Sequence, residues 1–478
     1  MSTLQGVVRD SAAAVRQAEV IALDVRTNQR RIVTANDHGF YRILGLNPGR
    51  YAVTVRVVGR SPVTRLVDLF AGDRVEVDFQ LQQSANTLET VLIKERGSST
   101  AVQRMSVSST VADNEIQSLP LNTRNVMDLA ALAPGIRSFQ PAEGRSLPAA
   151  GSLRDERGLN LYLDGVEMKN YNSGNVVGSP QTGSPLPADG IEEMRVYLNP
   201  YDAEYARGAS YVLSAVSHRG SNETHGSAFA FFQNKDLISV TDFQRDIPNF
   251  EKPDFRRQQM GLSVRGPVMR DRLFYAASYE LSNTDTYIAV VPGKPPGDPS
   301  FWDAYAGVFK APNQNHTGLL RLTYAANVTN ALELIWSSRY MTGESRFGGT
   351  DARESAVEQE YAVNTLNLRH RWFPRSRISN ELSLQFVGWS HENGPVAAGP
   401  ELRYPTLTIG HSDAIFDIHE KQFRAAERLT YGFGTGPRSH LLKGGVEISR
   451  LLAAQYSPNN GEGSFRFRSE TAEPYEAV

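Results

Sequence analysis

The 478-residue sequence contains no cysteine, which excludes a disulfide framework, a thiolate metal site and a cysteine nucleophile. Its net charge is only -2 at pH 7, so it lacks the broad basic field of a nucleic-acid-binding protein, and we expect no such partner. No run of about 18 apolar residues occurs, which argues against a transmembrane helix but leaves a β-barrel open. The N-terminus MSTLQGVVRD lacks a charged region followed by an apolar core, so either the chain is cytoplasmic or its start is missing.

A zinc-peptidase signature is absent as well. HExxH places two histidines on one face of a helix, with the glutamate as general base. None of the nine histidines has this spacing, because His391-Glu392 and His419-Glu420 are followed by no histidine four residues after the first. A soluble hydrolase would need a convergent acid, base or metal constellation, and none stands out. We therefore expect no enzyme activity, no cofactor and no metal site.

Short β-branched runs separated by turn signals fill residues 4–81. In DRVEVDFQL, Val75, Val77, Phe79 and Leu81 alternate with polar residues, the pattern of a half-buried strand. This pattern predicts a small antiparallel β-sandwich. The order GVV, HGFY, LNPGRY and a final alternating strand resembles the carboxypeptidase regulatory-like domain, a transthyretin-like sandwich with a carbohydrate-binding-like fold and no catalytic groups. We assign this domain to residues 1–83.

Residues 84–97, SANTLETVLIKERG, place the short strand-former LETVLI between polar residues. One interpretation is a last sandwich strand, or a linker that packs on a neighbour. The other is a segment that adds to the sheet edge of another protein through its free backbone groups. The residues alone leave both interpretations open.

Residues 98–222 predict a mixed α/β domain. LNTRNVMDLAALAPGI has helical spacing, with Asn122 or Thr123 as the cap, and Val126, Leu129, Ala130 and Leu132 as its apolar positions. GLNLYLDGVEM predicts a hairpin that turns at Asp164-Gly165. These stretches, followed by GIEEMRVYLNPYDAEYARG and AVSHRGSNETHGSAFAFF, resemble the plug domain of TonB-dependent outer-membrane receptors, and most closely the Oar-like receptors. Leu198-Asn199-Pro200 replaces the Arg-Gly-Pro turn of many plugs, so the arginine of an ion-pair latch is missing there.

Residues 223–478 show the alternation of outer-membrane barrel strands. In ALELIWSSRY, Leu332, Leu334, Trp336 and Tyr340 share one face, opposite Glu333, Ser337 and Arg339, with Ile335 as an exception. ISNELSLQFVGW alternates in the same way, with Ile378, Leu382, Leu384 and Phe386 on one face and Ser379, Glu381, Ser383 and Gln385 on the other. AFAFF, residues 228–232, is expected to be the first wall strand, with its aromatics facing lipid. Four aromatics at strand ends suit interfacial girdles: Tyr275, Tyr324, Trp372 and Trp389. A soluble sandwich face would give the same alternation.

The resemblance implies a mainly β chain: a sandwich, a small α/β plug and an incomplete antiparallel transmembrane β-barrel. Plugged transporters have about 22 strands, whereas the 256 residues after Asn222 give room for roughly ten to twelve. We therefore expect an N-terminal fragment of a receptor. The polar segments Pro292–Asn315 and Gly348–Glu360 are expected to be extracellular loops that first contact a ligand.

The resemblance also implies energy-coupled uptake across the bacterial outer membrane, with TonB and outer-membrane lipid as partners. The ligand is open among siderophores, cobalamin, glycans and peptides. A TonB box pairs with TonB as an added strand, and the candidate here comprises Glu89, Thr90, Val91, Leu92 and Ile93. The alternative is a surface adhesion or carbohydrate-binding protein without transport activity.

Overall fold

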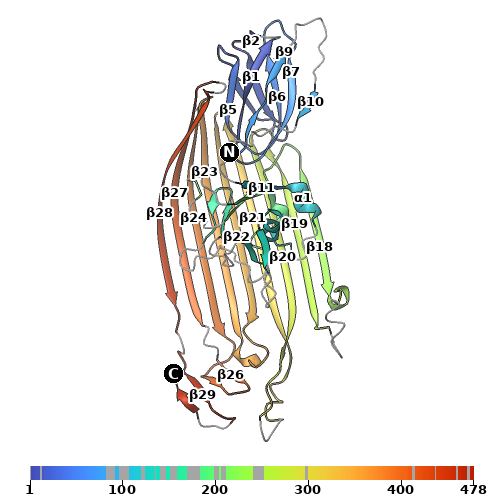
Figure 1. Ribbon diagram of the computed structural model, residues 1–478, viewed down its shortest axis with the longest axis vertical. Coiled ribbons are helices and arrows are strands. Elements are labelled where there is room, and N and C mark those ends of the chain that lie inside the picture. The colour runs from blue at the N-terminus through green and yellow to red at the C-terminus, as the bar shows by residue number, and fades with distance from the viewer. Residues whose placement is uncertain are drawn as a thin grey trace.

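The computed structural model describes residues 2–10, 13–81, 92–95, 107–119, 124–134, 136–139, 147–150, 159–169, 184–198, 204–205, 211–240, 252–295, 300–411, 415–435, 438–458, 461–470 and 474–477. Figure 1 shows an N-terminal sandwich at one end of a tall curved sheet, which we call the wall. The described residues between 107 and 222, which we call the inner segment, lie against one face of the wall (Figure 1). No helix in the described ranges is long and apolar enough to cross a membrane.

The sandwich consists of two five-stranded sheets around one apolar core. The first sheet contains β1 (Ser2–Asp10), β2 (Ala13–Ala14), β5 (Phe40–Leu46), β8 (Arg74–Glu76) and β9 (Phe79–Leu81). The second has the order β10 (Leu92–Glu95), β7 (Val63–Leu69), β6 (Gly49–Arg56), β3 (Glu19–Asp24) and β4 (Arg30–Thr34). The alternation seen in the sequence is confirmed, because Val75, Val77, Phe79 and Leu81 are each 1% exposed.

The sandwich is not wholly antiparallel, contrary to the prediction from sequence. β1 pairs in parallel with β8 and β9, and β10 pairs in parallel with β7. A Cβ atom on Gly6 would lie 1.9 Å from the carbonyl oxygen of Val77, so glycine is needed where β1 passes the break between β8 and β9. Alternation within a strand fixes which face is buried, but it carries no information on the direction of the neighbouring strand.

The inner segment has its own mixed sheet with the order β11-β16-β17-β14-β15. Its elements are β11 (Val107–Ala112), α1 (Asp113–Ser118), η2 (Val126–Leu132), β12 (Ile136–Phe139), β13 (Leu147–Ala150), β14 (Leu159–Leu163), β15 (Val166–Glu167), η4 (Ala188–Gly190), β16 (Ile191–Leu198) and β17 (Tyr211–Ser217). The Asp164-Gly165 turn is confirmed, and both residues have positive φ, 49° and 82°, as a type I′ turn requires.

The predicted amphipathic helix of the inner segment is a 3₁₀ helix, η2. Its cap is Asn125, whose side chain accepts a hydrogen bond from the Met127 N–H; Asn122 and Thr123 lie outside the described residues. Leu132, one of the four predicted apolar positions, is 51% exposed, whereas Val126, Leu129 and Ala130 are fully buried. Apolar spacing in so short a segment therefore did not distinguish the two helix types.

Nine long antiparallel strands form the wall within the described residues. In spatial order they are β18 (His225–Asn234), β19 (Phe255–Met269), β20 (Leu273–Val290), β21 (Gly307–Asn327), β22 (Asn330–Ser345), β23 (Val357–Arg375), β24 (Ile378–Pro395), β27 (Phe416–Phe433) and β28 (His440–Tyr456). Two short helices lie between wall strands, η5 (Lys235–Leu237) and η6 (Arg353–Ser355). The strands reach 21 residues in β21, well beyond the length of about ten that the strand count assumed. The same stretch of chain therefore yields fewer strands.

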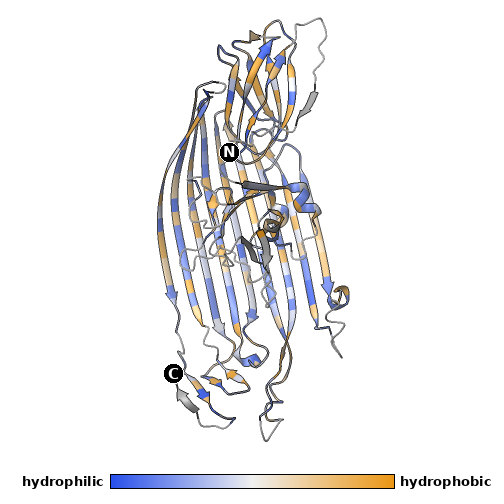
Figure 2. Ribbon diagram, in the orientation of Figure 1, coloured by the Kyte–Doolittle hydropathy of each residue, from blue (hydrophilic) through white to orange (hydrophobic). Residues whose placement is uncertain are grey.

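The two faces of the wall differ as the sequence predicts. Glu333, Ser337 and Arg339 are buried beneath the inner segment, whereas Leu332, Trp336 and Tyr340 are 39 to 40% exposed on the outward face. On β24, Ser379, Glu381, Ser383 and Gln385 are buried in the same way, and Leu382 and Leu384 are exposed. Figure 2 shows polar and apolar residues alternating along these strands. One face therefore suits an apolar medium and the other a polar interior.

Trp389, Phe229 and Phe231 were expected to face lipid but point inward, whereas Phe232, 56% exposed, lies outward as predicted. Trp389 is 6% exposed and packs against Tyr361 on the inner face, at a ring distance of 5.8 Å. On β18, Phe229 and Phe231 face the inner segment, because the guanidinium of Arg124 lies 3.9 Å from the Phe229 ring centre. An aromatic side chain can face lipid or pack against a buried cation. Residue type alone therefore did not show which face of the wall these side chains occupy.

The far end of the wall, away from the sandwich, is more ordered than a set of polar loops. Part of each expected loop is strand, since β21 begins at Gly307 and β23 at Val357. Other described residues of both segments pack around Trp302, whose indole N–H donates to Thr406 Oγ1 at 3.0 Å. A small four-stranded sheet lies there, with the order β26 (Thr408–Gly410), β25 (Glu401–Arg403), β29 (Ser464–Phe467) and β30 (Pro474–Ala477). Polar residues can pair as strands wherever both faces of a hairpin meet water.

The sandwich core provides a test of the fold. Phe79 is 1% exposed and its ring lies 6.1 Å from that of Tyr41. Phe79→Ala should destabilise the sandwich by about 3–5 kcal/mol, because it leaves a cavity between the sheets. Val58→Ala is the control, since Val58 is fully exposed and its truncation should change stability by less than about 0.5 kcal/mol. Thermal unfolding of the purified chain checks both values; equal effects would contradict the described core.

Candidate functional site

A buried cluster of charges joins the inner segment to the wall. Glu333 of β22 is 1% exposed and pairs with Arg321 at 3.1 Å, with Arg369 at 3.4 Å and with Arg371. Arg321 Nη1 also donates to Asp164 Oδ1 and to the Ser217 carbonyl, each at 3.1 Å. Removing charges from water is costly unless they are paired and hydrogen-bonded. One wall arginine therefore binds a wall carboxylate and an inner-segment carboxylate together.

The Asp164-Gly165 turn lies at the centre of this cluster. A Cβ atom on Gly165 would lie 3.7 Å from guanidinium nitrogens of both Arg369 and Arg428, so the turn backbone meets the wall closely. Ser217 supports the turn by donating from its hydroxyl to Asp164 Oδ2 at 2.5 Å. A tight I′ turn thus presents one carboxylate to a group of wall arginines.

Two further contacts hold the inner segment at either side of this turn. Arg424 of β27 donates to Glu167 Oε2 at 2.7 Å, and Asn160 donates to Glu167 Oε1 at the same distance. On the other side, Arg124 binds Asp189 at 2.5 Å and lies 3.3 Å from Glu280 of β20. The wall residues in these contacts lie on β20 and β27, which are the third and eighth of the nine described wall strands. The inner segment is therefore held at two widely separated strands.

The sandwich is attached to the inner segment at β16. The Ala71 N–H donates to Glu193 Oε2 at 3.0 Å, and Arg195 Nη2 donates to Asp73 Oδ1 at 3.1 Å. Glu193 and Arg195 are 2% and 4% exposed. A second attachment joins Arg26 to Glu192 at 2.5 Å. The turn after β7 and the loop after β3 therefore both end on adjacent acidic residues of one inner strand.

The sandwich also touches the turns at the near end of the wall. Arg31 donates to the Val328 carbonyl at 2.8 Å, and its guanidinium lies 3.4 Å from the centre of the Phe373 ring. Arg74 donates to Ser439 Oγ at 2.7 Å. These hydrogen bonds join the sandwich to at least two wall turns, and Figure 1 shows the sandwich at that end of the wall.

Glu192 and Glu193 are adjacent, but their pKa values are shifted in opposite directions. Burial raises the pKa of Glu193 to about 7, against the attraction of Arg195. Burial also works against the charge of Glu192, but Arg219 and Arg26 outweigh it and hold its pKa below the ordinary value of 4.5. Glu193 is therefore the group of the interface that changes charge near neutral pH.

Part of the candidate TonB box lies in a described strand. Leu92 and Ile93 begin β10, which pairs in parallel with β7. Glu89, Thr90 and Val91 lie outside the described residues. Residues 92–95 thus form a strand of the sandwich, as in the first of the two interpretations, and the assignment of a TonB box stays a prediction.

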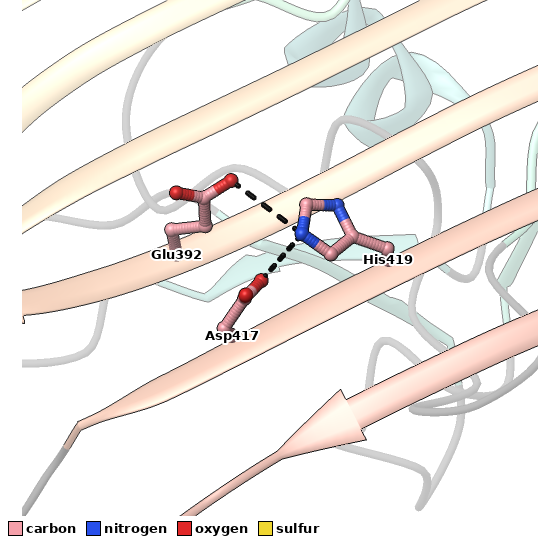
Figure 3. A group of neighbouring side chains, drawn as sticks. All are labelled: Glu392, Asp417 and His419. Atoms are coloured by element: carbon pink, nitrogen blue, oxygen red, sulfur yellow. Dashed lines mark ion pairs between the residues drawn. The ribbon is translucent and has the colours of Figure 1, made fainter.

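Three side chains on the outward face of the wall have the geometry of a possible cation site (Figure 3). His419 Nε2 lies 2.7 Å from Asp417 Oδ1 and 3.8 Å from Glu392 Oε1. All three side chains are nearly half exposed. An exposed ion pair explains this arrangement fully, so the group assigns no metal. The histidines that failed the HExxH spacing are thus wall residues on β24 and β27.

Comparisons with known proteins match the sandwich and the first strands of the wall. Residues 3–82 match the carboxypeptidase regulatory-like domain, and residues 216–334 match an outer membrane beta barrel domain. The TonB-dependent transporter Oar of Myxococcus xanthus is 25% identical over 297 residues, which cover 59% of this chain and 27% of that protein. The chain is thus a homologue of a TonB-dependent transporter over these residues.

Solved structures share the fold of this receptor homologue at low identity. The outer membrane transporter YddB from Escherichia coli gives a TM-score of 0.59 at 14% identity, over 77% of this chain and 51% of that one. The siderophore receptor PirA from Acinetobacter baumannii gives 0.52 at 16% identity, over 74% and 49%. The chain thus spans about a quarter of the length of Oar and about half of these structures.

The outer-membrane location explains the outward face of the wall. Its exposed Leu332, Leu366, Leu368 and Leu384 meet lipid, and at the sandwich end they give way to aromatics. Tyr324 and Trp372, 40% and 45% exposed, lie outward at that end as predicted for a girdle. The outward face is therefore that of an outer-membrane β-barrel strand array.

The sequence analysis missed the partners of the buried charges. It placed Glu333 on the polar face of its strand, but Arg321, Arg369 and Asp164 were not connected with it. A signal was present, because a carboxylate on the inward face of a lipid-facing strand requires a counter-charge. Which cation supplies it depends on strand register, and the sequence does not contain register in a readable form.

Glu333 provides a test of the buried cluster. Glu333→Leu leaves Arg321, Arg369 and Arg371 without their shared carboxylate and should destabilise the protein by about 3–5 kcal/mol, because uncompensated buried charges remain. The measurement is chemical unfolding in detergent micelles. Asp417→Asn is the control: it removes an exposed carboxylate on the outward face and should cost at most about 1 kcal/mol. Similar losses in the two variants would rule out the cluster as the stabilising feature.

The two adjacent glutamates predict the pH dependence of the sandwich contact. The pKa of Glu193 is raised from 4.5 to about 7. The stability that this shift gives to the sandwich contact is therefore fully present below pH 4.5 and is lost as the pH rises to about 7, by at most about 3 kcal/mol. Glu193→Gln should abolish this decline between pH 5 and pH 8. Glu192→Gln should retain the slope but lower stability at neutral pH, because a lowered pKa stabilises above 4.5. Limited proteolysis that releases the sandwich measures both; an unchanged slope in the Glu193 variant would refute the assignment.

Proposed function

We propose that the chain works in energy-coupled uptake across the outer membrane, with residues 98–222 as the plug of a barrel that begins at residue 223. The homology to the TonB-dependent transporter Oar supports this function. The observation that carries the proposal is the charge cluster of Asp164, Arg321 and Glu333. It fixes a small domain against the polar face of a membrane wall, which is the arrangement a plugged transporter needs.

The proposal assigns the sandwich, residues 1–83, to the periplasmic mouth and residues 84–97 to a linker that carries the TonB box. TonB would add a strand to Glu89–Ile93 and pull on the plug from its N-terminal side. The ligand remains one of four classes: siderophore, cobalamin, glycan or peptide. PirA, which shares the fold, is named as a siderophore receptor, and this makes a ferric siderophore the first probe.

The alternative is a surface adhesion or carbohydrate-binding protein without transport activity. The sandwich fold favours it, since such sandwiches share a carbohydrate-binding-like fold. The two functions differ in their requirement for TonB. Glycan binding that persists without TonB, together with no TonB-dependent uptake, would support the adhesion protein.

Val91 tests the proposed coupling. Val91→Pro removes a backbone donor from the candidate TonB box and should reduce TonB-dependent uptake at least tenfold. Val91→Thr is the matched control, because it keeps the N–H and a β-branched side chain and should leave uptake unchanged. The assay follows a labelled panel of ferric siderophores, cobalamin, maltodextrin and peptides in cells with and without TonB. Normal TonB-dependent uptake by the proline variant would eliminate this segment as the box.

A further inference from the structure

The wall beneath the Asp164-Gly165 turn carries more arginine than its own carboxylates balance. Four guanidinium groups gather there, those of Arg321 on β21, Arg369 and Arg371 on β23, and Arg428 on β27. Within the described residues, the wall carboxylates that pair with them are Glu333 and Glu381. This part of the inward face is therefore positively charged until the inner segment is added.

Asp164 of the inner segment supplies a further negative charge. Its Oδ1 accepts from Arg321 Nη1 at 3.1 Å, and its side chain is 2% exposed. Guanidinium nitrogens of Arg369 and Arg428 face the same turn, 3.7 Å from the position of a Cβ atom on Gly165. Asn-Gly suits a type I′ turn as well as Asp-Gly does, so the turn does not explain why this residue is charged. The arginines explain it, because the carboxylate of Asp164 is their anion.

The same hairpin also meets the next arginine of the wall. Glu167 of β15 accepts from Arg424 of β27 at 2.7 Å, and the two side chains are 3% and 5% exposed. The β14–β15 hairpin thus carries two carboxylates, and each reaches a buried wall arginine. Together they occupy a surface whose chemistry suits an anion.

We propose that these wall arginines form an anion-binding site on the uptake path, which Asp164 occupies at rest and a carboxylate or phosphate group of the cargo occupies when the inner segment moves aside. This inference rests on the proposed function, because uptake requires that movement. Guanidinium groups bind carboxylate and phosphate with the same planar, two-point geometry. The proposal narrows the four ligand classes to those members that carry such a group.

The cost of unpaired charge favours an anionic cargo over a neutral one. The side chains of Arg321 and Arg371 are each 4% exposed, and a buried charge that loses a partner is destabilising. A neutral cargo would leave this charge unbalanced as Asp164 departs, whereas an anionic cargo replaces the departing carboxylate. A cleft lined by one sign of charge also concentrates ligands of the opposite sign.

A small anion tests the site directly. Asp164→Gly removes the carboxylate, leaves room for acetate, and suits the positive φ of 49° at this position. In detergent micelles the variant should have a lower thermal unfolding midpoint than the unmodified protein. Sodium acetate should recover at least half of that loss in a saturable manner, because it binds the folded state. Acetamide, the neutral analogue, and sodium chloride at equal ionic strength should recover none of it.

Asp164→Asn is the matched control variant. It keeps the turn and fills the space of the carboxylate, so acetate should stabilise it no more than chloride does. A failure of acetate to recover Asp164→Gly would overturn the site. Equal stabilisation of the asparagine and glycine variants by acetate would show a general salt effect and overturn it as well.

Uptake then tests the class of cargo. Cells with and without TonB receive labelled probes in matched pairs: a ferric siderophore with or without free carboxylates, maltodextrin with or without a phosphate, and one peptide with aspartate or asparagine. The charged member of at least one pair should enter at least about tenfold faster in a TonB-dependent manner, as one charge-assisted contact predicts. The pair that responds distinguishes carboxylate from phosphate.

Arg428 and Arg50 provide the matched arginine variants. Arg428→Gln should lower uptake of the charged probe about tenfold, after correction for the amount of protein in the outer membrane. Arg50→Gln is the control, because Arg50 pairs with Asp68 on the exposed surface of the sandwich, and it should leave uptake unchanged. Unchanged uptake by the Arg428 variant would place the charge preference elsewhere and overturn the role of this site.

The two failures are distinguishable. If no probe enters in a TonB-dependent manner, the proposed function fails and the cargo class fails with it, while acetate recovery of Asp164→Gly still decides whether the arginines form an anion site. If neutral members enter as fast as their charged partners, the uptake function stands and the anionic cargo is refuted.

Discussion

The buried carboxylate of Glu333 sets a constraint on which much of this structure depends. A wall strand with lipid on one side must turn its polar residues inward, and Glu333 is inaccessible there. The cost of burying it is offset only if cations reach it, and Arg321, Arg369 and Arg371 do so from neighbouring strands. Three arginines around one carboxylate give an excess of positive charge, which Asp164 of the inner segment helps to balance. The inner segment thus completes an electrostatic arrangement that the wall cannot complete alone.

The same logic extends to the contact between the sandwich and the inner segment. Backbone groups take part there as they do at the wall, because Ala71 supplies an N–H to Glu193 and Pro48 supplies a carbonyl to Arg219. A backbone partner is insensitive to side-chain substitution, so this contact depends on loop conformation as much as on charge. Adjacent glutamates with opposite pKa shifts follow from their unequal supply of cations.

Sequence reasoning succeeded where a local period decides the outcome. Alternation placed Glu333 inward and Trp336 outward, and Asp164-Gly165 fixed a turn, because side-chain direction and positive φ are local properties. It failed where the environment decides. Trp389 is as suitable for a lipid boundary as for the space beneath the inner segment, and the apolar spacing of η2 suits a 3₁₀ helix as well as an α-helix. The partners of Glu333 lie 12, 36 and 38 residues away along the chain, so register, which no local pattern contains, determined the site.

A continuous series of contacts links β10 to the wall. β10 pairs with β7, the turn after β7 binds Glu193 and Arg195, and β16 pairs with β17, whose Ser217 accepts from Arg321. Such continuity does not by itself establish coupling; that requires an element with two arrangements. In this series the four-residue ladder of β10 and β7 is the shortest contact, whereas each buried ion pair beyond it has several partners. A pull on the chain at β10 would therefore load the short ladder before the charged contacts.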